Sequence, residues 1–272
     1  MLVQSCQVIS LIRQVANEEI LPRFQSLSQN EIFKKKDGEV VTIADIIVEN
    51  RLTIALKDLL PQSKVIGEET TNTSLSELEI KNNPNPIWII DPIDGTRNFV
   101  NGEPCFAVMI ALLFKNKLEA SWIYDPITDT TIHSIRGKGS WEGNTKLKLP
   151  QSLPIAKMKG SFPVRLKDKI QKNQLIKNQQ IPIFVDRYRC IGREYMDLAR
   201  GKLDFLRYQG TLKLWDHAPG LLITREIGWY DALTNNNKPY SCLSIKTRYN
   251  IMLARKHETW VMLQKLVDDC II

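Results

Sequence analysis

Cysteine, histidine and long hydrophobic runs are all scarce in this sequence. Its 272 residues include five scattered cysteines with no Cys-x-x-Cys pair, and three histidines far apart from one another. These absences argue against a disulfide framework, a thiolate metal site and a cluster of histidine ligands. The apolar residues near the N-terminus are interrupted by Gln4, Gln7 and Arg13 and recur at helical spacing, as in an amphipathic helix. We therefore expect reduced cysteines, a cytoplasmic location and no membrane association.

Positive charge is present in excess, but it is concentrated in one segment. The formal net charge is +7, and residues 157–180 hold seven basic residues against Asp168 alone, an excess of six. That segment has no aromatic residue beyond Phe162 and no familiar nucleic-acid motif. A solvated surface segment is favoured over a polyanion-binding patch, so nucleic acid is not expected as a partner.

The composition allows a sizeable core in one large domain or in two lobes in close contact, since 43% of the residues are hydrophobic. Apolar patterning predicts helices over 2–20 and 46–60, and strands at 64–66, 87–90, 106–114, 118–124 and 128–135, the third and fourth forming a hairpin. Past Pro150, polar loops lead to a helix near 194–200, a strand at 203–208, a helix from Asp216, a strand at 250–254 and a closing helix from 258. We place a boundary near residue 150, between an N-terminal α+β lobe (1–150) and a C-terminal α/β lobe (151–272).

Two aspartates follow the apolar run at 87–90. Asp91 and Asp94 flank Pro92, which lacks the backbone N–H that a continuing sheet would use. We therefore expect the strand to stop at Asp91 and both carboxylates to face open space. Gly95 and Thr96 come next, and a glycine there lets backbone N–H groups approach an anion such as phosphate.

Three further acids lie at similar positions. Glu68 and Glu69 follow the strand at 64–66 through Gly67, and Asp216 begins a predicted helix, which it could simply cap. Carboxylates gathered at strand ends repel one another unless a cation lies between them. Oxygen ligands without histidine favour hard ions such as Mg²⁺, with Mn²⁺ also suitable. The pattern indicates metal-assisted phosphoryl transfer to water.

Three motifs carry a family resemblance. The segments GEET (67–70), WIIDPIDGTRNF (88–99) and LWDHAPG (214–220) together resemble the inositol monophosphatase family of metal-dependent, typically lithium-sensitive phosphomonoesterases. The resemblance extends over nearly the whole chain and includes DGEVVTIAD at 37–45. It implies a layered αβαβα sandwich, a homodimer and a small phosphorylated substrate hydrolysed by water that two or three metal ions activate.

The resemblance also implies a set of metal ligands. Glu68, Asp91 and the backbone carbonyl of Ile93 would hold a first Mg²⁺. Asp91, Asp94 and Asp216 would hold a second, so that Asp91 bridges the two ions. Glu68 would also reach a third, weaker ion through water.

Catalytic and phosphate-binding residues follow from the same resemblance. Gly95 and Thr96 would bind the substrate phosphate through their backbone N–H groups. The Thr96 hydroxyl and Asp45 would orient and deprotonate the attacking water, with Glu68 taking part and Glu69 acting indirectly.

The residues expected to contact the alcohol depart from the family pattern. Inositol-specific members carry a glutamate seven residues before the last metal aspartate, and this chain has Gln209 there. Around Gly192, Arg193 and Tyr195 it also lacks the usual run of small residues. Gly192, Arg193 and Gln209, with Asp216, are the expected substrate contacts, and an arginine could bind a second phosphate or a carboxylate.

Three functions stay open at this point. The first is Mg²⁺-dependent hydrolysis of a sugar, polyol or similar alcohol phosphate. The second is hydrolysis of a bisphosphate, either a 3′(2′),5′-bisphosphate nucleotide or fructose 1,6-bisphosphate. A remote third is a non-catalytic polyanion-binding protein. His217, next to Asp216, is expected to be a non-ligand because adjacent helical residues point about 100° apart.

Overall fold

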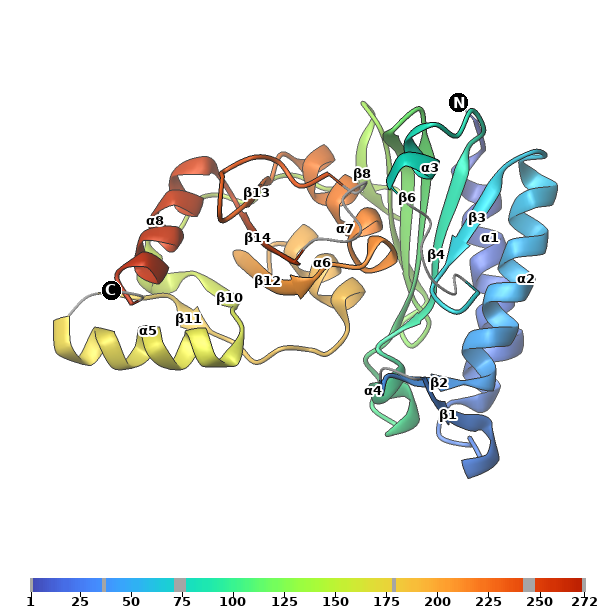
Figure 1. Cartoon of the computed structure of the whole chain (residues 1–272), viewed down its shortest axis with the longest axis horizontal. Helices are drawn as coiled ribbons and strands as arrows, with labels where there is room; N and C mark the ends of the chain where they lie inside the picture. Colours follow the sequence, from blue (N-terminus) through green and yellow to red (C-terminus); the bar gives the residue numbers. More distant parts are fainter. Residues whose placement is uncertain (1, 36–37, 71–76, 178–179, 242–247, 271–272) are drawn as a thin grey trace.

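The computed structural model of the protein describes residues 2–35, 38–70, 77–177, 180–241 and 248–270. Five layers alternate between helices and sheets, in the order α1 and α2, a seven-stranded sheet, α6 and α7, a five-stranded sheet, and α5 with α8 (Figure 1). The predicted layered αβαβα sandwich is confirmed.

The first layer is the predicted pair of N-terminal helices. Helix α1 (Ser5–Val15) continues through a π-helical turn (Ala16–Ile20) and a 3₁₀ turn (Leu21–Arg23), and α2 spans Ile43–Leu59. Their buried apolar residues recur at three- and four-residue intervals and pack against the seven-stranded sheet, where Trp88 and Trp122 lie fully buried. Helix α2 begins at a capping box in which the side chains of Thr42 and Asp45 bond each other's backbone N–H groups.

The seven-stranded sheet forms the second layer, with its strands in sequence order from β3 to β9. Within this sheet, β3 and β4 pair in parallel, and the other described neighbouring strands pair antiparallel. The predicted hairpin of β5 and β6 is confirmed, and Lys115 and Asn116 turn it with φ angles of 48° and 63°. The strands are β3 (Lys64–Gly67), β4 (Ile87–Asp94), β5 (Ala107–Phe114), β6 (Lys117–Asp125), β7 (Thr130–Ile135), β8 (Gly139–Glu142) and β9 (Thr145–Lys146).

Strand β4 corrects one prediction, because it does not stop at Asp91. Asp91 pairs with Met109 and Asp94 with Ala107, so three steps on β4 oppose two on β5. A bulge of one extra residue therefore accommodates Pro92, and the strand resumes pairing at Asp94. Side chains three apart in a regular strand point to opposite faces, and the extra residue returns Asp91 and Asp94 to the same side.

The remaining layers belong to the C-terminal half. Helices α6 (Ile191–Ala199) and α7 (Leu214–Ile227) lie between the two sheets, and α8 (His257–Asp268) covers the outer face with α5. The five-stranded sheet has the order β11-β10-β12-β14-β13. Its strands are β10 (Lys159–Ser161), β11 (Ile183–Phe184), β12 (Phe205–Thr211), β13 (Tyr230–Leu233) and β14 (Arg248–Ala254).

Helix α5 (Val164–Lys177) is a second correction, because polar loops were predicted in this segment. Leu166 and Ile170, four residues apart, pack in the cluster that holds Phe162 and Trp260. This narrow apolar contact is enough to dock a helix whose other residues are mostly lysine, glutamine and arginine, which favour helices intrinsically. So few apolar positions leave little periodicity to detect in the sequence.

Short elements complete the structure. Strands β1 (Ile32–Lys34) and β2 (Val40–Thr42) pair antiparallel, and α3 (Glu77–Lys81) and α4 (Thr96–Val100) are short helices. The chain passes from the first sheet to the second between Lys146 and Lys159, the region of the predicted boundary. Side chains from both halves share one core cluster, for example Met109 and Leu221.

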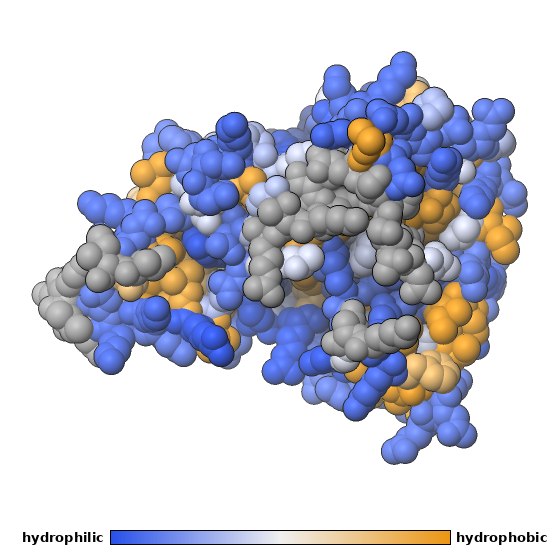
Figure 2. Space-filling model, viewed as in Figure 1, coloured by the Kyte–Doolittle hydropathy of each residue, from blue (hydrophilic) through white to orange (hydrophobic). Residues whose placement is uncertain are grey.

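No helix among the described residues is long and apolar enough to span a bilayer. On the face shown in Figure 2, hydrophilic residues dominate and hydrophobic ones form separate patches. The four described cysteines, Cys6, Cys105, Cys190 and Cys270, are free, and Cys242 lies outside the described residues.

Candidate metal and phosphate site

A cavity of about 530 Å³ gathers most of the residues that the motifs singled out. The carboxyl end of β4, the turn into α4, and the start of α7 all open into it. It is lined by Glu39, Val40, Glu68, Asp91, Ile93, Asp94, Gly95, Thr96, Arg97, Arg189, Lys213 and Asp216. Sequence positions as distant as Glu39 and Asp216 therefore meet at one place.

Three carboxylates in this cavity are close enough to share a cation. Glu68 follows β3, Asp91 lies on β4 and Asp216 lies in the first turn of α7. One carboxylate oxygen from each lies within 4.8 Å of the other two. Among the described residues, this is the one group of three or more potential ligands with such spacing.

The electrostatics of this cluster favour a bound cation. Burial, together with the charges of Glu68, Asp94 and Asp216, raises the pKa of Asp91 well above its usual value. The pKa of Asp216 is raised in the same way. Asp91 Oδ1 is buried without a hydrogen-bond partner among the described residues, which is costly for a carboxylate oxygen. An oxygen-only donor set with an unsatisfied buried oxygen fits a hard divalent ion such as Mg²⁺.

Asp94 also lines this cavity, and its carboxylate is bonded by residues at the start of α6. Its Oδ2 accepts a hydrogen bond from the backbone N–H of Gly192 at 2.5 Å and lies 3.1 Å from the Cys190 thiol. A Cβ on Gly192 would lie 3.0 Å from Met109 Sδ and 3.2 Å from Asp94 Oδ2. Gly192 thus contacts Asp94 closely, although it was predicted as a substrate contact and does not line the cavity.

Asp45 and Thr96 lie together beside the carboxylates. Thr96 Oγ1 is 3.2 Å from Asp45 Oδ1 and 3.0 Å from the carbonyl oxygen of Ile93. Asp45 Oδ2 accepts hydrogen bonds from the Thr42 N–H at 2.7 Å and the Thr42 hydroxyl at 2.6 Å. Burial outweighs these bonds and raises the pKa of Asp45 to about 7. A carboxyl with this pKa can exchange a proton near neutral pH.

Gly95 makes the turn between β4 and α4. Its φ is +90°, a conformation that glycine adopts without the steric cost met by other residues. A Cβ there would also lie 3.0 Å from the Cys105 carbonyl oxygen and 3.1 Å from Cys190 Cβ. The turn that presents Thr96 therefore requires glycine on two independent grounds.

Two lysines that the sequence did not single out approach Glu68. Lys35 Nζ lies 3.3 Å from Glu68 and 2.8 Å from the carboxylate of Glu69, and Lys213 Nζ lies 3.5 Å from Glu68 while pairing with Glu39. Burial raises the pKa of Glu69 to about 7 although Lys35 opposes the shift. Nothing in the local sequence around Lys35 or Lys213 indicates this arrangement.

Of the residues predicted to contact the substrate beyond its phosphate, Asp216 lines the cavity, whereas Gly192, Arg193 and Gln209 do not. The Arg193 guanidinium pairs with the buried carboxylate of Asp125, and Gln209 is exposed on β12. Tyr195 is fully buried and stacks on Tyr208, with ring centroids 5.8 Å apart. The lining arginines are instead Arg97 and Arg189, both exposed residues.

His217 faces away from the carboxylates, as predicted. Its Nδ1 lies 3.2 Å from the Tyr195 hydroxyl, and its ring packs against Tyr208 and Tyr240. Burial, with the nearby positive charge of Arg187, lowers its pKa to about 3, so the ring is neutral.

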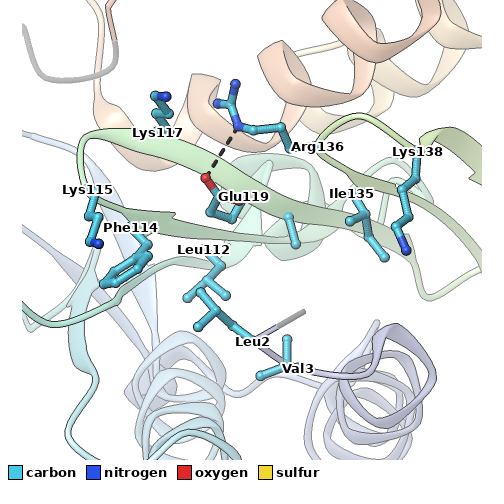
Figure 3. A pocket seen from close by; sticks show the side chains of 11 residues that line it. Leu2, Val3, Leu112, Phe114, Lys115, Lys117, Glu119, Ile135, Arg136 and Lys138 are labelled. Carbon is cyan, nitrogen blue, oxygen red and sulfur yellow. Dashed lines mark ion pairs between the residues drawn. The ribbon is translucent and has the colours of Figure 1, made fainter.

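A second cavity, of about 600 Å³, lies at the end of the β5–β6 hairpin near Leu2 and Val3 (Figure 3). Its floor is apolar, and its one acid, Glu119, lies 3.5 Å from Arg136. With no group of carboxylates in its lining, it lacks the chemistry of the first cavity.

The buried carboxylates predict how stability depends on pH and on Mg²⁺. A carboxyl whose folded pKa is raised binds protons in the folded state that the unfolded chain releases, so stability is present at low pH and is lost as pH rises toward the folded pKa. For Asp45 this window runs from the ordinary aspartate pKa of 3.8 to its folded pKa of about 7.

Without metal, we expect the free energy of unfolding to fall by on the order of a few kcal/mol between about pH 5 and pH 8. Saturating Mg²⁺ should remove most of that fall, because the bound ion stabilises the carboxylates of the folded protein in place of the protons they lose as pH rises. Denaturant titrations at both pH values with and without Mg²⁺ would measure this. Metal-free stability that rises with pH would contradict it.

Comparison with known proteins assigns the chain to a family. The sequence model of the inositol monophosphatase family matches residues 3–256. The chain is 31% identical over 221 residues to a Vibrio cholerae protein named Nus factor SuhB, covering 78% of this chain and 79% of that one. It is 30% identical over 202 residues to inositol monophosphatase 1 of Solanum lycopersicum, covering 72% and 73%.

A solved structure described as IMPase/NADP phosphatase complexed with Mg²⁺ and phosphate superposes with a TM-score of 0.77 at 21% identity, covering 96% of this chain and 92% of that one. This similarity shows a common fold. The chain belongs to the inositol monophosphatase family, as the three motifs predicted.

Proposed function

We propose that this protein is a Mg²⁺-dependent phosphomonoesterase. One observation carries the proposal: a cluster of the buried Asp91 with the half-buried Glu68 and Asp216 opens into the same cavity as the Gly95–Thr96 turn, and Asp91 Oδ1 has no hydrogen-bond partner among the described residues. The family, and the Mg²⁺ and phosphate in the description of the similar structure, agree with it.

The residues of the cavity suggest which groups would bind the metal. Glu68, Asp91 and Asp216 would hold Mg²⁺, with Asp94 and the Ile93 carbonyl as further ligands and Mn²⁺ as a possible substitute. Bound ions would supply positive charge to the phosphoryl oxygens and lower the pKa of a bound water. We propose that two or three ions bind.

Asp45 and Thr96 would orient the attacking water and accept the proton that it releases. The Thr96 hydroxyl can donate to Asp45 Oδ1, and its oxygen can then accept from a water on the cavity side. Asp45 is the acceptor of the proton that the attacking water releases, for which a pKa near 7 is suited. Gly95 and Thr96 would bind the phosphate through their backbone N–H groups.

The substrate is proposed as a small alcohol phosphate, such as a sugar or polyol phosphate. Arg97, Arg189 and Lys213 also line the cavity, and Arg97 and Arg189 have no carboxylate partner among the described residues. These cations support the second candidate, a bisphosphate with a further anionic group. Arg193 was predicted for that role, but its pairing with Asp125 favours the lining arginines instead.

A substrate panel tests the function. Purified protein with Mg²⁺ is incubated with inositol monophosphate, sugar monophosphates, a 3′,5′-bisphosphate nucleotide and fructose 1,6-bisphosphate, and released phosphate is measured. We expect Mg²⁺-dependent release from at least one compound, and a chelator should stop it. Preferred turnover of a bisphosphate would select the second candidate.

The alternative is a non-catalytic role, and the names of the relatives called Nus factor SuhB do not describe a phosphatase. Folded protein that releases no phosphate from any compound, with Mg²⁺ or Mn²⁺, would favour that role and defeat the phosphatase proposal.

We further propose that the protein is a cytoplasmic homodimer and that lithium inhibits it. Sedimentation would test the dimer, and adding lithium salts to the same assay would test the inhibition.

A further inference from the structure

The turn that carries Glu68 is fixed by a buried acid that no motif singled out. Glu49 lies on α2, four residues after Asp45, and is completely buried. Its Oε2 accepts a hydrogen bond from the Glu69 N–H at 2.8 Å, and its Oε1 accepts one from the Thr70 N–H at 2.7 Å. Both carboxylate oxygens are therefore used on consecutive backbone donors.

The residue before Glu68 shows how closely this carboxylate approaches the turn. A Cβ on Gly67 would lie 2.1 Å from Cδ of Glu49 and 2.3 and 2.4 Å from its two oxygens. Any other residue at position 67 would push the carboxylate away from the two amides. Gly67 thus leaves the space that Glu49 occupies, which explains why GEET begins with glycine.

The backbone of Glu68 is held on both sides as a result. Its own N–H donates to the Ile90 carbonyl of β4 at 3.1 Å, which continues the β3–β4 pairing by one residue. The next two N–H groups donate to Glu49. These three bonds hold the backbone of Glu68 so that its side chain stays close to Asp91 and Asp216, although the three carboxylates repel one another when no cation is bound.

We propose that Glu49 is a positioning residue that holds Glu68 in place for metal binding, an inference that rests on the proposed function. Helix α2 then presents two buried carboxylates one turn apart with different tasks. Asp45 contacts Thr96 beside the reacting groups, and Glu49 shapes the loop that supplies a metal ligand. Groups that orient metal ligands in this way commonly affect metal affinity by roughly ten- to a hundredfold.

The substitution Glu49→Gln tests this. A glutamine has one acceptor oxygen, and its NH₂ group cannot accept from the second amide, so one of the two bonds is lost. We expect Mg²⁺ affinity to fall roughly tenfold or more, with much of the turnover recovered at saturating Mg²⁺. Affinity is measured by calorimetry with Mg²⁺ and by paramagnetic resonance with Mn²⁺, both without substrate.

Asp204→Asn is the matched control. Asp204 is 2% exposed, accepts the Lys159 N–H at 2.7 Å and pairs with Arg255, at the ends of β12 and β14 of the five-stranded sheet. Its substitution should lower the melting temperature while leaving Mg²⁺ affinity unchanged, so loss of stability alone is separated from the effect at Glu68. If Glu49→Gln does not fold, Glu49→Asp, whose shorter side chain cannot reach both amides, replaces it.

The outcomes are distinct. An unchanged Mg²⁺ affinity in the folded Glu49 variant would overturn the role of Glu49. Wild-type protein that binds Mg²⁺ but hydrolyses nothing would defeat the phosphatase proposal while the binding comparison still decides the role of Glu49. Wild-type protein that binds neither Mg²⁺ nor Mn²⁺ would overturn both.

Discussion

Replacing Asp91 with asparagine is expected to lower phosphatase activity by at least about a thousandfold, equivalent to roughly 4 kcal/mol of lost transition-state stabilisation. Asp91 is one of the three clustered carboxylates, and the amide of asparagine lacks both the charge and the second oxygen with which a carboxylate holds cations. The measurement is kcat/KM with the best substrate of the panel at saturating Mg²⁺.

The same variant should be at least as stable as the wild type when no metal is present. Burial and the neighbouring carboxylates disfavour a charge on Asp91, and asparagine has none to bury. Thermal unfolding should therefore show no loss in melting temperature, and the stabilisation by Mg²⁺ should be much reduced. Glu119→Gln is the control: it removes one negative charge, as Asp91→Asn does, but on β6 and outside the cavity lining, so it should leave activity intact. Wild-type-like turnover by Asp91→Asn would contradict the metal assignment.

Replacing Asp45 with asparagine should reduce turnover by roughly a hundredfold or more, the typical contribution of a general base. The base acts when deprotonated, so wild-type activity should rise as pH increases through the pKa of Asp45, which is about 7 without metal. Because bound Mg²⁺ is positive, it should move the apparent pKa to a lower value. In the variant this pH-dependent rise should disappear, as measured from profiles of kcat/KM.

Asp45 also caps α2, so a control must separate the two roles. Thr42→Ala removes the hydroxyl bonded to Asp45 Oδ2 but keeps the carboxylate beside Thr96. It should cost about 1 kcal/mol of stability, as expected for a lost N-cap, and keep most of the activity. A pH rise that survives in Asp45→Asn would show that another group accepts the proton.

The layered sandwich was implied by the family resemblance, and the carboxylate cluster was predicted because its acids lie in local sequence motifs. Apolar periodicity identified the helices and the long strands of the first sheet, and chain order placed the acids after them. Glu68, Asp91 and Asp216 were assigned as metal ligands from motifs, and the structure brings them within 4.8 Å of one another.

The parts that the sequence did not predict depend on tertiary contacts. Glu49 acts on amides twenty residues further along the chain, and Lys213 reaches Glu39 and Glu68 across the cavity. Helix α5 was missed because few of its residues are apolar. Arg193 was expected in the substrate pocket, and its buried partner Asp125 on β6 could not be foreseen from either local sequence.

The bulge in β4 gives the spacing of the two aspartates a meaning of its own. In an uninterrupted strand, acids that share a face are separated by an even number of steps, whereas Asp91 and Asp94 are three apart. The additional residue at the bulge reverses, for the residues that follow it, which side of the sheet each side chain faces. An insertion of one residue between the two aspartates would keep both acids and Gly95 in the sequence, yet with the same bulge it would turn Asp94 to the opposite side. Thus the length of the DPID segment, as much as its composition, determines which carboxylates can meet.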